Sequence, residues 1–333
     1  MNAIVGNVAR AAAARFQLSL FQLRHIHVNL IQNLDRLPDT LLAGAVTIGN
    51  FDGVHRGHAR IVERLLARAR QVGGPAIVFT FEPHPVRLLR PAETPPPLTS
   101  IDRKAELLNA LGVDAVVAYP TDRQLLALSP DEFFDLIIRQ RLQAKALVEG
   151  PNFFFGRNRA GDVDLLDQLC QRHHVQLEIV EPLLADGGYV SSSRIRDLIQ
   201  IGQVGKADQL LTQPYRVRGA VVRGAGRGAS IGFATANLDP SEMWLPAKGV
   251  YAGRAHLGRQ VYPAAINIGP NPTFGENAVK FESHLVGIDR ALYGEMLEVE
   301  FLDRLRDVCT FANVDALRQQ LVEDVAATIE IAG

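Results

Sequence analysis

The stretch "GNFDGVHRGHARIVERLL", residues 49–66, decides the fold of the first half of this chain. A short apolar run ends at Gly49, and a turn with amide, acidic and glycine residues follows it. A helical pattern then begins, with His58, Ile61, Val62, Leu65 and Leu66 on one face. His58 is therefore expected on the buried face, at the helix start. Strand, tight turn and helix in this order predict a parallel α/β sheet, where ligands bind beyond the carboxyl ends of the strands.

The same alternation continues to about residue 205. Short runs that are almost continuously apolar predict strands buried on both faces, and helical patterns separate them. The strands are expected at 44–49, 75–83, 113–120, 145–150 and 175–182, and the helices near 58–71, 101–111, 130–142, 163–173 and 193–201. The proline-rich segment 90–100 is expected to be a surface loop. We therefore predict a Rossmann-like N-terminal domain with a parallel sheet and right-handed crossovers.

The pattern changes after residue 214 to short strands that are broken by glycine and proline. Helical spacing returns only at 313–332. Several short strands and one final helix predict a small antiparallel β-barrel with a terminal helix. We expect a poorly ordered extension over 1–25, a first domain over 26–205 and a second domain over 206–333.

The composition excludes several classes of protein. Hydrophobic residues make up 47% and charged residues 21%, as in ordinary soluble globular proteins. The chain has 35 Lys and Arg against 36 Asp and Glu, and this balance gives no general attraction to nucleic acid or to a membrane surface. Cys170 and Cys309 have neither zinc nor redox spacing, which favours a reducing compartment. We expect a cytoplasmic protein without nucleic-acid or membrane partners, and the oligomeric state stays open.

The residues alone leave two interpretations open for His55 and His58. A helix start offers unpaired N–H groups and the positive end of the helix dipole, so two imidazoles there favour binding of a phosphate. The alternative is a capping turn that satisfies one of the histidines. The segment "VSSSRIRDLI", 190–199, is open in the same way. Its serines can cap a helix while Arg196 binds phosphate through paired donors, or its arginines are simply solvated.

A glycine-rich run, "GAGRGASIGFATANL" at 224–238, has neither P-loop nor dinucleotide-binding spacing. Thr235 and Asn237 are two residues apart on an extended segment and should point the same way. They offer the hard oxygen ligands that Mg²⁺ prefers when it carries phosphates. The alternative is a glycine-rich hairpin whose polar residues are incidental.

These motifs carry a family resemblance. The sequence "GNFDGVHRGH" resembles the H-x-G-H signature of nucleotidyltransferases, in the longer form found in the bifunctional riboflavin kinase/FMN adenylyltransferase (FAD synthetase) family. The segments "TFEPHP" (80–85), "PNFFFGRNRAGD" (151–162) and "VSSSRIRDLI" are similar to other parts of that first domain. The run at 224–238 resembles the riboflavin kinase signature G-x-x-x-G-F-P-T-A-N-L. Further matches are "GVYAG" (249–253), "AAINIGPNPTF" (264–274), "FESHLVGID" (281–289) and "LYGEMLEVEFLDRLR" (292–306).

The resemblance implies two reactions. The C-terminal domain would convert riboflavin and ATP to FMN and ADP, and the N-terminal domain would convert FMN and ATP to FAD and pyrophosphate. Mg²⁺ would accompany ATP, and FMN and FAD would be substrate and product rather than prosthetic groups. For the adenylyltransferase, the resemblance implies that His55 and His58 are catalytic and that Asn152 lies on the flavin side. The implied ATP-binding residues are Gly49, Phe51, His55, Gly57, His58, Ser192, Ser193 and Arg196.

For the kinase, the resemblance implies ATP binding at Gly226, Gly232, Thr235 and Asn237. Thr235 and Asn237 would be the Mg²⁺ ligands. Glu282 would be the catalytic base, although a glutamate in an alternating strand is usually just solvent-facing.

The chain departs from the family pattern at a few positions. Ala234 stands where the family has proline, so we expect slower or weaker use of MgATP. Ser193 replaces the usual threonine but keeps the hydroxyl, and Pro151 alters the flavin-side loop. Two alternatives follow. Either only one module works, which Ala234 suggests would be the adenylyltransferase, or the chain is a non-catalytic flavin- or nucleotide-binding regulator. The intact His55 and Glu282 argue against a regulator.

Overall fold

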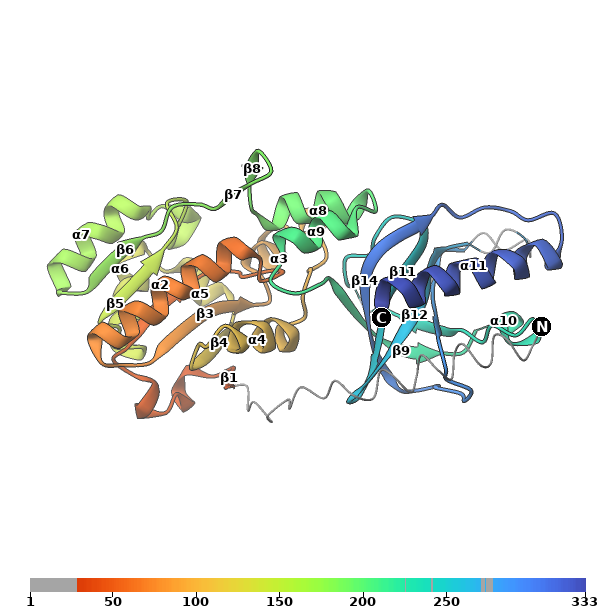
Figure 1. Cartoon of the computed structure of the whole chain (residues 1–333). Coiled ribbons are helices and arrows are strands. Elements are labelled where there is room, and N and C mark those ends of the chain that lie inside the picture. The colour runs from red at the N-terminus through yellow and green to blue at the C-terminus, as the bar shows by residue number, and fades with distance from the viewer. Residues whose placement is uncertain (1–28, 225, 241, 271–272, 274–277) are drawn as a thin grey trace. The chain divides into compact units, whose positions relative to one another are not determined.

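The computed structural model describes residues 29–224, 226–240, 242–270, 273 and 278–333, and these form two compact units (Figure 1). We call them the N-terminal unit, which ends at Ser192, and the C-terminal unit, Ser193–Gly333. The expected extension, 1–25, lies outside the described residues. The division at Ser192 and the boundary expected at residue 205 differ by α8 (Ser192–Gln200) and part of α9 (Val204–Leu210).

The N-terminal unit is built on a six-stranded parallel sheet with the order β1-β4-β3-β2-β5-β6. All five predicted strands are present, and the two-residue edge strand β1 was not predicted. Their bounds are β1 (Leu30–Ile31), β2 (Ala45–Ile48), β3 (Ala76–Glu82), β4 (Ala115–Pro120), β5 (Ala146–Glu149) and β6 (Gln176–Ile179). Strands β3 and β4 follow β2 on one side of it, whereas β5 and β6 lie on its other side, so the strand order reverses between β2 and β5. The crevice for a ligand is therefore expected at the carboxyl ends of β2 and β5.

Helices cover both faces of this sheet, as the near-continuous apolar strands require. They are α2 (Arg56–Val72), α3 (Pro85–Leu89), α4 (Ile101–Ala110), α5 (Arg123–Ala127), α6 (Pro130–Phe133), the π-helix η4 (Phe134–Arg141) and α7 (Val163–His173). Side chains alternate along β2: Val46 and Ile48 pack with η4 and α7, whereas Ala45 packs with α2 and α4. Short 3-10 turns are η1 (Leu34–Arg36), η2 (Asp39–Leu41), η3 (Pro91–Glu93) and η5 (Arg157–Arg159), and β7 (Leu184–Ala185) pairs with β8 (Gly188–Tyr189).

One expectation for this unit is wrong in part. The segment 90–100 was expected to be a surface loop, but its end is buried, with Leu98 at 0% and Thr99 at 8% exposure. Both residues bind the carboxylate of Asp52 through backbone N–H groups. The end of the segment is therefore a structural partner of the turn that follows β2.

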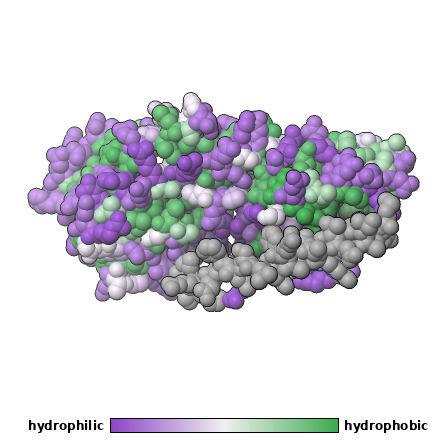
Figure 2. Space-filling model, viewed as in Figure 1, coloured by the Kyte–Doolittle hydropathy of each residue, from purple (hydrophilic) through white to green (hydrophobic). Residues whose placement is uncertain are grey.

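The C-terminal unit is a closed antiparallel barrel with the order β10-β13-β12-β11-β14-β9, which confirms the predicted barrel. The strands are β9 (Arg216–Val222), β10 (Ala236–Asp239), β11 (Gly249–Leu257), β12 (Gln260–Gly269), β13 (Lys280–Leu285) and β14 (Met296–Arg306). Tyr251, Phe281 and Phe301 fill its interior. The predicted terminal helix, α11 (Val314–Ala332), packs on β11 and β12, and a short α10 (Arg227–Ser230) precedes β10. Figure 2 shows hydrophilic residues over much of the described surface in that view, with smaller hydrophobic patches between them.

Candidate active sites

The turn after β2 is held in one conformation by its own side chains. A Cβ at Gly49 would lie 3.1 Å from the ring of Phe51, so the glycine lets this ring fold back under the strand end. Phe51 has φ of +47° and Gly53 has φ of +81°, in the left-handed region. The buried carboxylate of Asp52 accepts three bonds from Leu98 and Thr99 at 3.1 to 3.2 Å. Hydrogen bonds from the segment before α4 thus support this turn.

His55 and His58 cap α2 reciprocally. The N–H of His58 donates to Nδ1 of His55 at 3.2 Å, and the N–H of His55 donates to Nδ1 of His58 at 3.3 Å. The rings stack with their centroids 3.6 Å apart. A Cβ at Gly57 would lie 3.1 Å from the His55 ring, so Gly57 gives the rings their room. The capping interpretation is therefore right in part, and it applies to both histidines rather than one.

The cap also fixes which nitrogen of each ring carries the proton. Because Nδ1 accepts in both rings, each neutral imidazole has its proton on Nε2, which leaves Nε2–H as a donor. Burial lowers the pKa of His55 to about 4, although the charge of Asp52 opposes this. Burial, with the charges of His55 and Lys104, also holds the pKa of His58 well below its ordinary value. Both rings are therefore neutral hydrogen-bond donors at pH 7.

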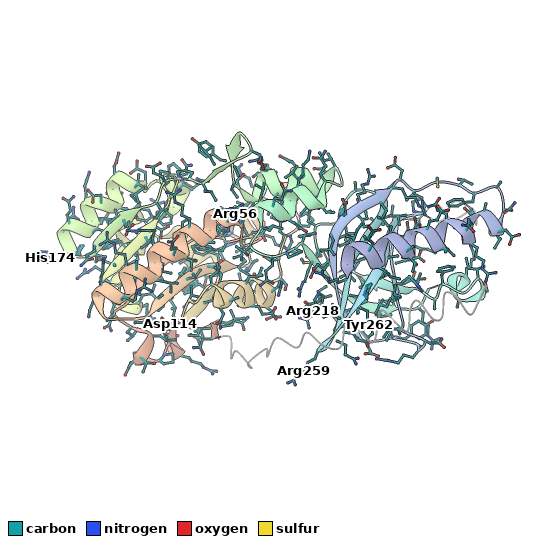
Figure 3. All side chains as sticks on the ribbon, viewed as in Figure 1. Arg56, Asp114, His174, Arg218, Arg259 and Tyr262 are labelled. Atoms are coloured by element: carbon teal, nitrogen blue, oxygen red, sulfur yellow. The ribbon has the colours of Figure 1, made fainter. Side chains whose placement is uncertain are left out.

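Other predicted residues of this site are placed as follows. The hydroxyl of Ser192 donates to the carbonyl of Asp52 at 2.8 Å, which ties the start of α8 to the turn. Asn152 is exposed in the loop that follows β5. Ser193 is exposed and Arg196 is half-buried, and both belong to α8 in the C-terminal unit. Their role beside His58 stays a prediction. Figure 3 labels Arg56 at the start of α2, beyond the carboxyl end of β2, and Asp114 just before the amino end of β4.

Two buried ionisable side chains near the turn were not predicted. Glu149, at the end of β5, is 3% exposed, and its Oε1 accepts from the N–H of Ile48 at 2.7 Å. Lys104 in α4 is 6% exposed. Their sequence contexts gave no signal, because a lone glutamate or lysine in an amphipathic element usually faces solvent.

Three of the five kinase candidates, Gly226, Thr235 and Glu282, line a cavity on the outer face of the barrel, whereas Asn237 and Gly232 do not. The buried residues Ala236 and Ser283 alternate with Asn237 and Glu282, which point outward. Several of the predicted residues line this cavity beside α11. The lining includes Gly226, Thr235, Asn267, Lys280, Glu282, His284, Arg306, Leu317 and Leu321.

Three polar side chains form a row across neighbouring strands at this face. Asn237 of β10 lies opposite Glu282 of β13, and Glu282 lies opposite Asn267 of β12. Directly opposed residues share a face of the sheet, with Cβ atoms roughly 5 Å apart. The amide of Asn267 donates to Oε2 of Glu282 at 3.5 Å. The row places Asn237 opposite Glu282, and it adds Asn267, which was not predicted.

The glycine-rich run is shaped around these residues. A Cβ at Gly224 would lie 2.1 Å from the amide nitrogen of Asn237, so a larger residue there would displace the Asn237 side chain. Gly228 accepts from the N–H of Phe233 at 2.8 Å, which closes the loop that precedes Thr235. Gly226 (φ +70°) and Gly232 (φ +91°) both take left-handed conformations, and Gly232 does not line the cavity. Thr235 is exposed at its edge.

Among the described residues, no cluster of three or more His, Cys, Asp or Glu side chains is placed to hold a metal ion. No helix in the described part of the chain has both the length and the apolar character needed to cross a membrane.

Known proteins resemble both units. A family model for FAD synthetase matches residues 38–194, and one for riboflavin kinase matches residues 211–332. The bifunctional riboflavin kinase/FMN adenylyltransferase of Pseudomonas fluorescens is 34% identical over 306 residues, which cover 92% of this chain and 98% of the relative. The chain belongs to the bifunctional riboflavin kinase/FMN adenylyltransferase family.

Other members of this family match over the same length. The enzyme of that name from Escherichia coli K12 is 33% identical over 92% of this chain and 98% of its own length. The enzyme of that name from Bacillus subtilis is 30% identical, and the match covers 91% of this chain and 96% of the relative. A solved structure from Streptococcus pneumoniae, described as a macrolide-efflux protein, superposes with a TM-score of 0.79 at 32% identity, over 90% of this chain and 97% of that one. Both the parallel sheet and the barrel are thus family features.

Proposed function

We propose that the α2 start carries FMN adenylylation and that the cavity beside α11 carries riboflavin phosphorylation. The first reaction joins FMN to the adenylyl group of ATP and releases pyrophosphate, and the second makes that FMN from riboflavin and ATP. The observation that carries the proposal is the pair of neutral imidazoles whose Nδ1 atoms are engaged in the cap. Their Nε2–H donors remain for phosphate oxygens.

At the adenylyltransferase site, an oxygen of the FMN phosphate attacks the α-phosphorus of ATP while the bond to pyrophosphate breaks. The nucleophile is already an anion, so the site needs no base. His55 and His58 donate to phosphate oxygens on which charge develops. Ser192, Ser193 and Arg196 complete the triphosphate contacts, with Gly49, Phe51 and Gly57 shaping the site and Asn152 on the flavin side. Positioning and charge stabilisation supply the rate enhancement.

At the kinase site, Glu282 accepts the proton of the terminal ribityl hydroxyl as that oxygen attacks the γ-phosphorus of ATP. Asn267 orients the carboxylate, which it contacts at 3.5 Å. Thr235 and Asn237 offer an oxygen donor set that fits Mg²⁺, and Gly226 and Gly232 shape the ATP loop. When bound with ATP, Mg²⁺ would neutralise charge on the phosphates.

We also propose a cytoplasmic location, since Cys170 and the exposed Cys309 are free thiols.

Separation of the two activities tests this assignment. The protein is given riboflavin and MgATP, and FMN and FAD are followed by chromatography. We expect His58→Ala to accumulate FMN while FAD formation falls about 10²-fold or more. Glu282→Gln should phosphorylate riboflavin about 10²-fold more slowly or worse, yet still adenylate supplied FMN.

Matched controls are His174→Asn, at the exposed end of α7, and Glu330→Gln on the exposed side of α11. Both should keep the two rates. Equal loss of both products in each active-site variant would refute the division of labour. An unaltered protein that binds flavin without turnover would instead support the regulator alternative, and one that makes only FAD from FMN would support a single working module.

A further inference from the structure

Lys104 lies inside the N-terminal unit rather than on its surface. Its side chain is 6% exposed. The next residues of α4, Ala105 and Leu108, belong to the apolar cluster that also contains Phe51 and Val54 of the turn. Lys145, the other lysine of this unit's described residues, is exposed just before β5. Of the two lysines in the described part of this unit, Lys104 is therefore the buried one.

The Lys104 ammonium has no ion-pair partner within 4.0 Å and no hydrogen bond among the residues that the structure describes. Burial of an unpaired charge is strongly unfavourable, and natural proteins rarely keep one without a purpose. Burial lowers the pKa of Lys104, while the more distant carboxylates of Asp52 and Glu82 oppose this. A charge that the protein leaves unpaired in this way is suited to an incoming anion.

The position of Lys104 relative to the histidine cap is fixed by covalent and hydrogen-bonded links. Ser100 caps α4, and the N–H of Lys104 makes the first helical bond, to the Ser100 carbonyl at 2.9 Å. The two residues before Ser100 bind the Asp52 carboxylate, and the Thr99 hydroxyl accepts from the N–H of Gly53 at 3.1 Å. The start of α4 is therefore bonded directly to the turn that leads into the cap. After burial and the charge of His55, the charge of Lys104 is a further cause that lowers the pKa of His58.

We propose that the Lys104 ammonium binds a substrate phosphate beside His58 and is a further catalytic residue of adenylyl transfer. The proposal rests on the function proposed for this site. A neutral imidazole donates a hydrogen bond but no charge, so the histidine pair alone leaves the phosphate charge unbalanced. Lys104 supplies a fixed positive charge from a helix that is not the one the histidines cap. Both ATP and FMN present phosphates, and the experiment separates these two sources.

The test compares Lys104→Met, Lys104→Arg and the control Lys145→Met in the full chain. Each is assayed for FAD formation from supplied FMN and for phosphorylation of riboflavin. We expect Lys104→Met to lower kcat/KM for FAD formation at least 10²-fold, while riboflavin phosphorylation is unchanged. Lys104→Arg keeps the charge and should recover part of the loss. Lys145→Met removes one positive charge at the amino end of β5, away from the histidine cap. Both of its rates should match those of the unaltered chain.

Stability distinguishes an anion-binding role from a structural one. Because Lys104→Met removes an unpaired buried charge, its Tm should equal or exceed that of the unaltered chain. Pyrophosphate, used as a probe without flavin, should bind Lys104→Met at least tenfold more weakly if the ammonium contacts the ATP phosphates. If it contacts the FMN phosphate, pyrophosphate binding is kept and the KM for FMN rises instead.

Two results would overturn the proposal. One is a Lys104→Met protein that adenylates FMN at the unaltered rate, and the other is a fall in Tm that accompanies the loss of activity. If His58→Ala also adenylates FMN normally, the assignment of the whole site fails. If His58→Ala is inactive while Lys104→Met is active, only the role of Lys104 is refuted.

Discussion

The carbonyl of Ala234 lies 2.8 Å from Nδ1 of His284, which donates to it from the neighbouring strand β13. Burial lowers the pKa of His284, so its ring is neutral at pH 7 and keeps this donor role. The bond holds the turn before Thr235 at the position where the riboflavin kinase signature that this run resembles has proline. A hydrogen bond from His284 thus restrains the backbone at Ala234.

Ala234→Pro should stabilise this turn further. No hydrogen bond from the Ala234 N–H is found in the described part of the chain, so proline removes none there. We expect about 0.4–1 kcal/mol of added stability through the unfolded chain and a lower KM for ATP in riboflavin phosphorylation. Thermal unfolding and kinase kinetics measure both. Ala234→Gly should change both quantities in the opposite direction, and a higher KM in Ala234→Pro would show that the native turn is not compatible with proline.

Between β2 and β5, the parallel ladder pairs Ala45 with Ala146 and Val46 with Leu147. On its other side, β2 stays paired with β3 as far as Ile48. The Glu149 side chain takes over where pairing with β5 stops, because it accepts from the N–H of Ile48. Burial raises the pKa of this carboxyl well above its ordinary value, although the Ile48 bond opposes the shift. The sheet therefore opens at the site without leaving this backbone donor unsatisfied.

Glu149→Gln should stabilise the N-terminal unit at high pH. In the unfolded chain the carboxyl ionises above its ordinary pKa of about 4.5, whereas in the folded chain it stays protonated to higher pH. Folding then requires proton uptake, so the contribution of Glu149 to stability falls as pH rises through this window. Glutamine keeps the acceptor and does not titrate. The Tm difference between variant and unaltered chain should grow from pH 5 to pH 8, whereas exposed Glu181→Gln should show none. A difference that is constant with pH would contradict this.

The whole chain divides earlier than the change of hydrophobic pattern suggests. Val204, Ala207 and Leu210 of α9 are buried, and α9 packs on β14 of the barrel. The N–H of Ala247 also donates to the Ile199 carbonyl of α8 at 3.2 Å. Both helices therefore support the barrel, although the expected boundary at residue 205 would assign α8 to the first domain.

A fragment 193–333 should be more stable than a fragment 206–333, because the shorter one loses α8 and cuts α9. Loss of one buried aliphatic side chain costs about 1.5–3 kcal/mol, so the difference should be visible as several degrees in Tm. Thermal unfolding and riboflavin phosphorylation are measured for both fragments. Equal Tm values would support the boundary at residue 205 instead.

The sequence was sufficient for the fold because apolar periodicity is local. The predicted strands and helices of both units are present, and a cap at the start of α2 was one of the two interpretations that the sequence left open. The missed features are long-range. The bonds from Leu98 and Thr99 to Asp52 join residues 46 and 47 positions apart. Glu149 and Lys104 look like ordinary surface charges until the fold buries them, and Asn267 gains its meaning only from its register opposite Glu282.

The two rings that form the reciprocal cap of α2 are also the ones for which we propose a role in catalysis. Serine, asparagine or aspartate would begin this helix equally well. A related chain that kept the fold but lost the activity could therefore replace both histidines with little loss of folding stability. Laboratory selection for heat resistance alone would offer no reason to retain them. Among related chains, loss of the activity should therefore show first as substitutions at positions 55 and 58.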